Sequence, residues 1–96
     1  MKYELINTDI SSERVIMRDI TETILNDNQE EVINIIGTEP TDNYEVTITI
    51  GVHPIDNIAP NFSKDVIVIS NNSMTGFEVD EQRKQAIQDY IILINQ

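Results

Sequence analysis

The sequence predicts a small α+β domain, in which a mainly antiparallel sheet carries helices on one face in a two-layer arrangement. Residues 44–52 alternate apolar and polar side chains, which is typical of a half-buried strand. Residues 65–70 are almost continuously apolar, and the chain from Asp80 onwards has helical spacing. At 96 residues the chain is expected to form a single acidic domain spanning 1–96.

The composition favours strands in the core. Eighteen residues are Ile, whereas only two are Phe and none is Trp. β-branched side chains are stiff and pack well on a pleated surface. A core built mainly from them therefore agrees with a sheet-based fold.

The first half of the chain is expected to contain one strand and one long helix. Residues 1–7 are compatible with a strand. Residues 8–26 are predicted to be a helix that begins near Ser11 or Ser12, because Ile16, Ile20 and Ile24 recur every four residues.

The pattern breaks at residues 26–31, and residues 32–36 have two interpretations. They could form a short helix that ends at Gly37, which we favour slightly because Glu30 and Glu31 suit a first helical turn. They could equally form a strand.

The second half is predicted to hold the sheet. Residues 38–43 should form a turn, 44–52 a strand, and 53–64 a long ordered connection. The apolar run 65–70 is expected to be a central strand covered on both faces. Residues 77–79 are predicted to form a short strand, and Asp80 to cap a C-terminal helix whose inner face carries Arg83, Ile87, Tyr90, Ile91 and Ile94.

The net charge is the most informative number for function. Seventeen acidic residues oppose six Lys and Arg, which gives −11. Residues 1–48 alone carry −8, from eleven acidic and three basic residues. Such a field repels nucleic acid and anionic membrane surfaces, so no direct binding to either is expected. A basic protein surface is the expected kind of partner.

No catalytic or metal-binding pattern emerges. The chain has no Cys, and its single histidine, His53, lies beside Pro54 where the strand should end. We interpret His53 as an ordinary strand-end residue, since no motif spacing gives it a catalytic partner. The isolated glycines make no phosphate-binding loop. The protein is therefore expected to be a non-enzyme without cofactor or metal.

The sequence shows no secretory signal and no apolar run long enough to cross a membrane, so a cytoplasmic location is expected. Arg14 and Arg18 are predicted to pair locally, with acidic residues one helical turn away.

A string of acidic residues in the first half is the predicted partner-binding site. Its members would offer carboxylates to a basic surface: Asp19, Glu22, Asp27, Glu30, Glu31, Glu39, Asp42 and Glu45. A folded surface rich in carboxylates can compete for a site that holds phosphates. Nucleic-acid mimics act in this way, among them small phage-encoded anti-restriction and anti-CRISPR proteins.

Two functions from different classes therefore follow. The favoured one is an acidic inhibitor or regulator that binds a basic, nucleic-acid-handling protein. The alternative is a structural subunit of a homo-oligomeric or virion-like assembly, because the apolar end YIILI at 90–94 is more than a small monomer readily covers.

Overall fold

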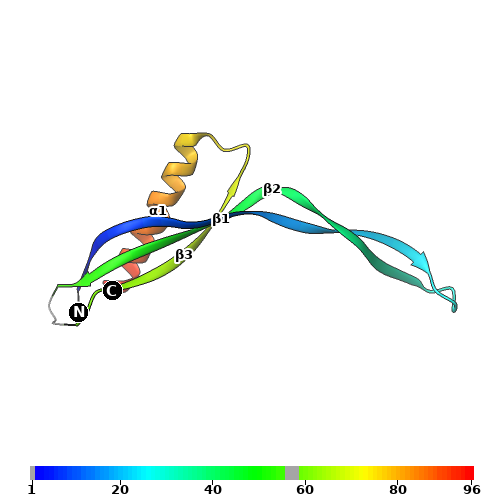
Figure 1. Cartoon of the computed structure of the whole chain (residues 1–96), viewed down its shortest axis with the longest axis horizontal. Coiled ribbons are helices and arrows are strands. Elements are labelled where there is room, and N and C mark those ends of the chain that lie inside the picture. Colours follow the sequence, from blue (N-terminus) through cyan, green and yellow to red (C-terminus); the bar gives the residue numbers. More distant parts are fainter. Residues whose placement is uncertain (1, 56–58) are drawn as a thin grey trace.

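The computed structural model describes residues 2–55 and 59–96. Three strands precede one helix: β1 (Tyr3–Leu25), β2 (Glu31–Pro54), β3 (Phe62–Asn71) and α1 (Gly76–Ile94). The strands form one antiparallel sheet in the order β1-β2-β3, so β2 is central and β1 and β3 are edges. Figure 1 shows that β1 and β2 make a long hairpin that continues far beyond β3 and α1.

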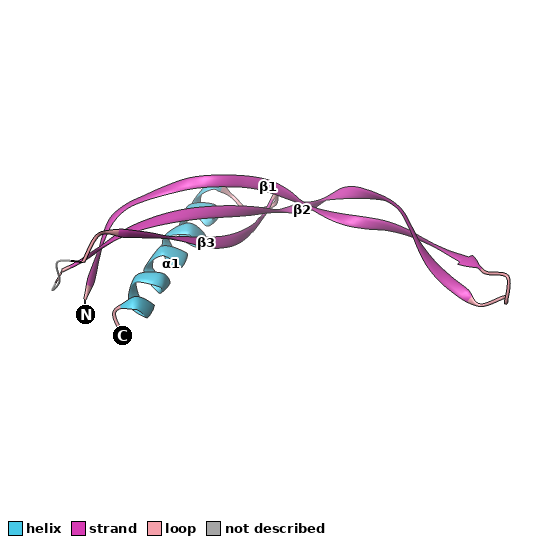
Figure 2. Cartoon of the chain, turned by 60° about the horizontal axis from the view of Figure 1, so that its bottom comes forward, coloured by secondary structure: helices cyan, strands magenta, loops and turns pink. Residues whose placement is uncertain are grey.

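The core lies on one face of the central strand. Alternate residues of β2 are buried there, namely Val46, Ile48, Ile50 and Val52, together with Val68 of β3. Alternation along a strand sends every second side chain to the same face. The intervening residues Thr47, Thr49 and Gly51 lie on the opposite face, over which the described residues place no helix or second sheet (Figure 2).

Helix α1 covers the buried face of the sheet. Thr75 is its N-cap: the Thr75 hydroxyl accepts from the Glu78 N–H, and the Glu78 carboxylate accepts from the Thr75 N–H. This capping box satisfies two otherwise unpaired donors. The inner face of α1 packs on the core through Ala86, Ile87, Tyr90, Ile91 and Ile94.

The molecule is extended rather than compact. Its radius of gyration is 20.5 Å and its dimensions are 68 × 31 × 21 Å. A compact domain of this length has a radius of gyration of about 12.5 Å. The difference arises from residues 16–43, the distal part of the β1–β2 hairpin, which we call the arm. We call the other described residues the body; both chain termini lie at the end of the body away from the arm (Figure 1).

The arm joins the body at an irregular part of β2. The register slips here, because Val15 pairs with Tyr44 whereas Met17 already pairs with Pro40. The Thr41 hydroxyl donates to the Ile16 carbonyl at 2.7 Å and so holds the two strands together across the slip. β3 ends at the same level, where Asn71 pairs with Asn43. We call this level, between Val15–Tyr44 and Met17–Pro40, the joint. Beyond the joint the sheet has only two strands.

The predicted α+β class is correct at the coarse level, with an antiparallel sheet and a C-terminal helix. The expected compact domain with several helices is not what the described residues form. They contain one helix, and the predicted helix at 8–26 is wrong because these residues belong to β1. A four-residue spacing of Ile is also an even spacing, so it places the side chains on one face of a strand as well.

Other boundaries also differ. Residues 32–36 are strand, which was the less favoured interpretation, and 38–43 are part of β2 rather than a turn. The predicted strand 65–70 is present, but as the edge strand β3 with one face exposed. Residues 77–79 are helical because the cap is Thr75, not Asp80. The predicted connection 53–64 is shorter than expected, and its residues 56–58 lie outside the described residues.

The strand at 44–52 is confirmed within β2, and His53 lies next to the last residue of that strand. The predicted inner face of the C-terminal helix is also confirmed. Arg14 and Arg18 pair across the hairpin rather than along a helix. Arg14 binds Glu45 at 3.1 Å, and Arg18 binds Glu39 at 2.6 Å.

A candidate protein-binding arm

The arm gathers the acidic residues that the sequence singled out. Seven of the eight lie within residues 16–43, and Glu45 follows two residues after them; Figure 2 shows how far this arm projects. The arm carries seven acidic residues and one basic residue, Arg18, so its net charge is −6 out of −11 for the whole chain. More than half of the excess negative charge therefore projects away from the body.

These carboxylates differ in what they already bind. Glu39 and Glu45 are held by arginines, and Glu22 accepts from the Asn34 side chain at 3.3 Å. The other five carboxylates receive no hydrogen bond or ion pair from the described part of the chain; they belong to Asp19, Asp27, Glu30, Glu31 and Asp42. These five are available to a partner.

The tip of the arm is a tight turn that presents three of the free carboxylates. The Asn26 side-chain oxygen accepts from the main-chain N–H groups of Asn28 and Glu30, each at 2.9 Å. Gln29 adopts a left-handed backbone conformation with φ 61°. Because these bonds hold the turn, Asp27, Glu30 and Glu31 are displayed together at its end.

The two faces of the arm differ in charge. On one face Thr21 pairs with Ile35, Thr23 with Ile33, and Leu25 with Glu31 at the tip. We call this the aliphatic face. The opposite face carries the pair Ile24–Val32 together with Glu22 and the Arg18–Glu39 ion pair. The middle of the aliphatic face thus has no charged side chain.

The aliphatic face lies open to solvent. Exposed fractions are 67% for Leu25, 73% for Ile33 and 62% for Ile35. A two-stranded hairpin has no second layer to bury such side chains, and an isolated one is only marginally stable in water. Both edges of the arm also lack a neighbouring strand, which makes them templates for pairing.

The exposed surface is large for a protein of this size. The accessible area is 7074 Å². A compact monomer of 11.0 kDa exposes about 5,600 Å². The excess of about 1,500 Å² is close to the total area buried in a standard protein–protein interface, about 1,600 Å².

A groove between β1 and α1 is the second notable surface. Two adjacent hollows of about 360 and 300 Å³ share Ile87 and are lined otherwise by side chains of β1, β2 and α1. We call it the β1–α1 groove and define it by Leu5, Thr8, Ile10, Arg83, Ile87 and Ile91. It exists because α1 packs across the buried face of the sheet but leaves Leu5 and Ile10 of β1 partly uncovered.

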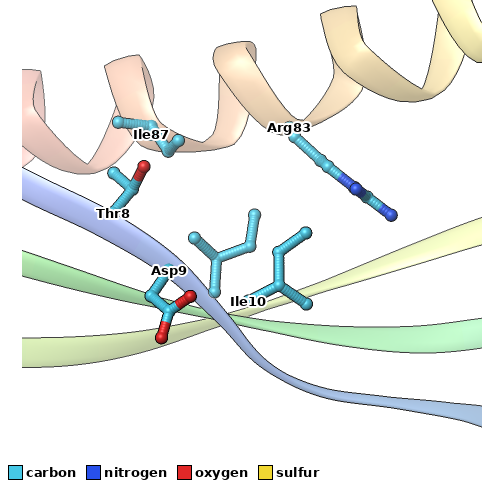
Figure 3. Close-up of a pocket in the computed structure, with 6 residues that line it drawn as sticks. Thr8, Asp9, Ile10, Arg83 and Ile87 are labelled. Atoms are coloured by element: carbon cyan, nitrogen blue, oxygen red, sulfur yellow. The ribbon is translucent and has the colours of Figure 1, made fainter.

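Arg83 is the charged residue that faces this groove. Figure 3 shows it on the same side of α1 as Ile87, while the Asp9 carboxylate points away from the helix. The side chain of Arg83 is only 22% exposed, and its Nη2 lies 4.0 Å from Glu13. Its buried Nε–H finds no acceptor in the described part of the chain. The groove therefore contains an incompletely paired cation.

The His53 side chain contacts Asn61. Its Nδ1 lies 2.5 Å from the Asn61 side-chain oxygen, which links the end of β2 to the residue before β3. The described residues include no cluster of three or more His, Asp or Glu that could hold a metal ion. In the same residues, no helix combines the length and apolarity that a membrane span requires.

The sequence interpretation identified the acidic part of the arm and missed its aliphatic part. The segment VINII at 32–36 carried the signal, since Ile33 and Ile35 flank the polar Asn34 at the spacing of one strand face. The groove had no local signal, because its two walls are far apart in the chain. Comparisons with protein-family models, curated proteins and solved structures give no match.

Proposed function

We propose that the protein is a non-enzymatic structural subunit that assembles with other copies through its arm. One observation carries this proposal: the arm exposes the aliphatic side chains of Ile33 and Ile35, opposite uncharged Thr partners, on a hairpin that no layer of the described residues covers. Such a surface costs free energy in an isolated molecule and is stabilised when a partner covers it. The virion-like assembly subunit is the class whose role fits best.

Sedimentation velocity of the full-length protein, over a concentration series, tests this. We expect a reversible oligomer. Each copy has a net charge of −11, so the copies repel one another. Added salt should strengthen their association, because the electrostatic screening length falls from about 10 Å at 0.1 M to about 3 Å at 1 M. A monomer at every concentration and salt level would contradict the proposal.

A second candidate is the acidic inhibitor of a basic, nucleic-acid-handling protein. It is favoured by the free carboxylates of Asp19, Asp27, Glu30, Glu31 and Asp42 on one projecting element. For this candidate, added salt should weaken binding to the partner, because salt screens the attraction between opposite charges. Here binding to a basic protein should be lost above about 0.5 M salt, and after reversal of these acids to Lys.

A further inference from the structure

We infer that the arm of one copy lies in the β1–α1 groove of the next copy, with the carboxylates of the arm's tip against Arg83. This rests on the proposed function and names the surface that receives the arm. Three properties of the two surfaces support it: their lengths, their apolar character and their charges.

The lengths are compatible. Each strand of the arm has about ten residues between the joint and the tip (16–25 in β1), which span about 33 Å. The groove runs along α1 from Arg83 to Ile91, eight residues that span about 12 Å. The four residues from Glu31 to Ile35, next to the tip, span about 13 Å, so this part of the arm is long enough to cover the groove.

The apolar side chains are complementary. The aliphatic face offers Leu25, Ile33 and Ile35, which are all more than half exposed. The groove offers Leu5 and Ile10, which are 45% and 44% exposed, beside Ile87 and Ile91. Contact between these surfaces would remove from water aliphatic side chains that the monomer leaves uncovered.

The charges select the orientation. Arg83 lies at the end of the groove near Glu13 and hence near the joint, whereas Leu5 and Ile91 lie towards the chain termini. An arm that enters from the terminal end brings its tip to Arg83. There a carboxylate of Asp27, Glu30 or Glu31 can accept a hydrogen bond from the Nη2 group, which lies 4.0 Å from Glu13 and so has no short bond to it.

The geometry makes the contact head-to-tail. The arm projects from one end of the body (Figure 1), whereas Leu5 and Ile91, at the far end of the groove, are near the two chain termini in sequence. The donor surface and the acceptor surface of one copy are thus separate, and each copy can use both at once. This separation allows the two surfaces to be inactivated independently.

The experiment uses two variants of the full chain. Ile33→Asp damages the arm, and Leu5→Asp damages the groove. Each replaces a side chain that is well exposed in the monomer, so the fold should be retained. Ile67→Asp is the matched control, since Ile67 is exposed on the sheet face opposite α1 and receives the same added charge.

We expect each single variant to weaken self-association by about tenfold or more, as loss of a central interface contact does. The control should associate like the unmodified protein. An equimolar mixture of the two variants should form a discrete heterodimer, because one intact arm and one intact groove remain. Recovery of association in the mixture also shows that both variants are folded.

Arg83→Met tests the ionic contact. It should weaken association about as much as the combined substitution of Asp27, Glu30 and Glu31 by Asn and Gln. Two results would show that the groove is not the receiving surface: Ile33→Asp abolishes association but Leu5→Asp does not, or the mixture of the two variants fails to associate. The inference would then be wrong, while the proposed function would stand. If the unmodified chain does not self-associate, both are wrong.

Discussion

The side-chain amide of Asn95 pairs in both directions with the main chain of Tyr3. The Tyr3 N–H donates to Asn95 Oδ1 at 2.8 Å, and Asn95 Nδ2 donates to the Tyr3 carbonyl at 3.1 Å. Asn95 follows the last turn of α1 and bonds the main chain of β1 on the side where β1 has no neighbouring strand. The two ends of the chain are joined by these bonds.

Replacement of Asn95 by Ala should lower the free energy of unfolding by about 1–2 kcal/mol, because two hydrogen bonds in a partly buried site are lost. Urea denaturation monitored by circular dichroism measures this. Gln96→Ala is the control, and it should change little. Equal stability of Asn95→Ala and the unmodified protein would show that these bonds are replaced by water without cost.

The two faces of the sheet should respond very differently to truncation. Ile50→Ala removes a completely buried side chain and should cost about 2–5 kcal/mol. Ile69→Ala removes a half-exposed one on the opposite face and should cost less than about 1 kcal/mol. The comparison requires denaturation at a concentration where the protein is monomeric. A similar loss for both would contradict the half-exposed position of Ile69.

Gly51 is expected to tolerate a side chain only if Asn7 moves. A Cβ at Gly51 would meet the side-chain oxygen of Asn7 on the neighbouring strand β1. Gly51→Ala should therefore destabilise the protein modestly, and Asn7→Ala should remove that penalty. The double-mutant cycle gives the coupling energy, which is expected at about 0.5–1 kcal/mol. Additive effects would show that the Asn7 side chain turns away without cost.

The arm should open more readily than the body. Amides of residues 16–43 belong to a two-stranded ribbon without a covering layer, whereas those of residues 46–52 lie in the central strand beneath α1. In monomeric protein, hydrogen exchange should be fast in the arm and slow in 46–52. Under assembling conditions protection of the arm should rise. Equal protection of both segments in the monomer would contradict this.

The sequence predicted those elements whose local pattern is unambiguous. Strict alternation from Tyr44 to Val52 identified the central strand and its buried face. The spacing of Arg83, Ile87 and Ile91 identified the inner face of α1. In both elements one face is buried in the same core, so the spacing of the apolar residues in the sequence matches the period of the strand or the helix.

The arm was misinterpreted because it has no single buried face. Exposed strands need no regular alternation, and Ile16, Ile20 and Ile24 satisfy the helical and the strand period alike. Pro40 indicated a turn, yet it lies in β2 where that strand no longer has β3 beside it, and prolines are tolerated at such edges. The acidic residues could be identified from composition, but their collection on one projection is a property of the three-dimensional fold.

The twist of the arm has a geometric consequence for any assembly that it builds. Adjacent strands rotate relative to each other by roughly 20–25°, and more in two-stranded ribbons, and Figure 2 shows the arm turning along its length. The orientation of its tip relative to the body therefore sets the rotation between successive copies. A rotation that divides a full circle closes a ring, and any other rotation with a rise gives a helical filament. In the proposed head-to-tail contact, the number of cross-strand pairs between the joint and Asn26 would therefore set this rotation.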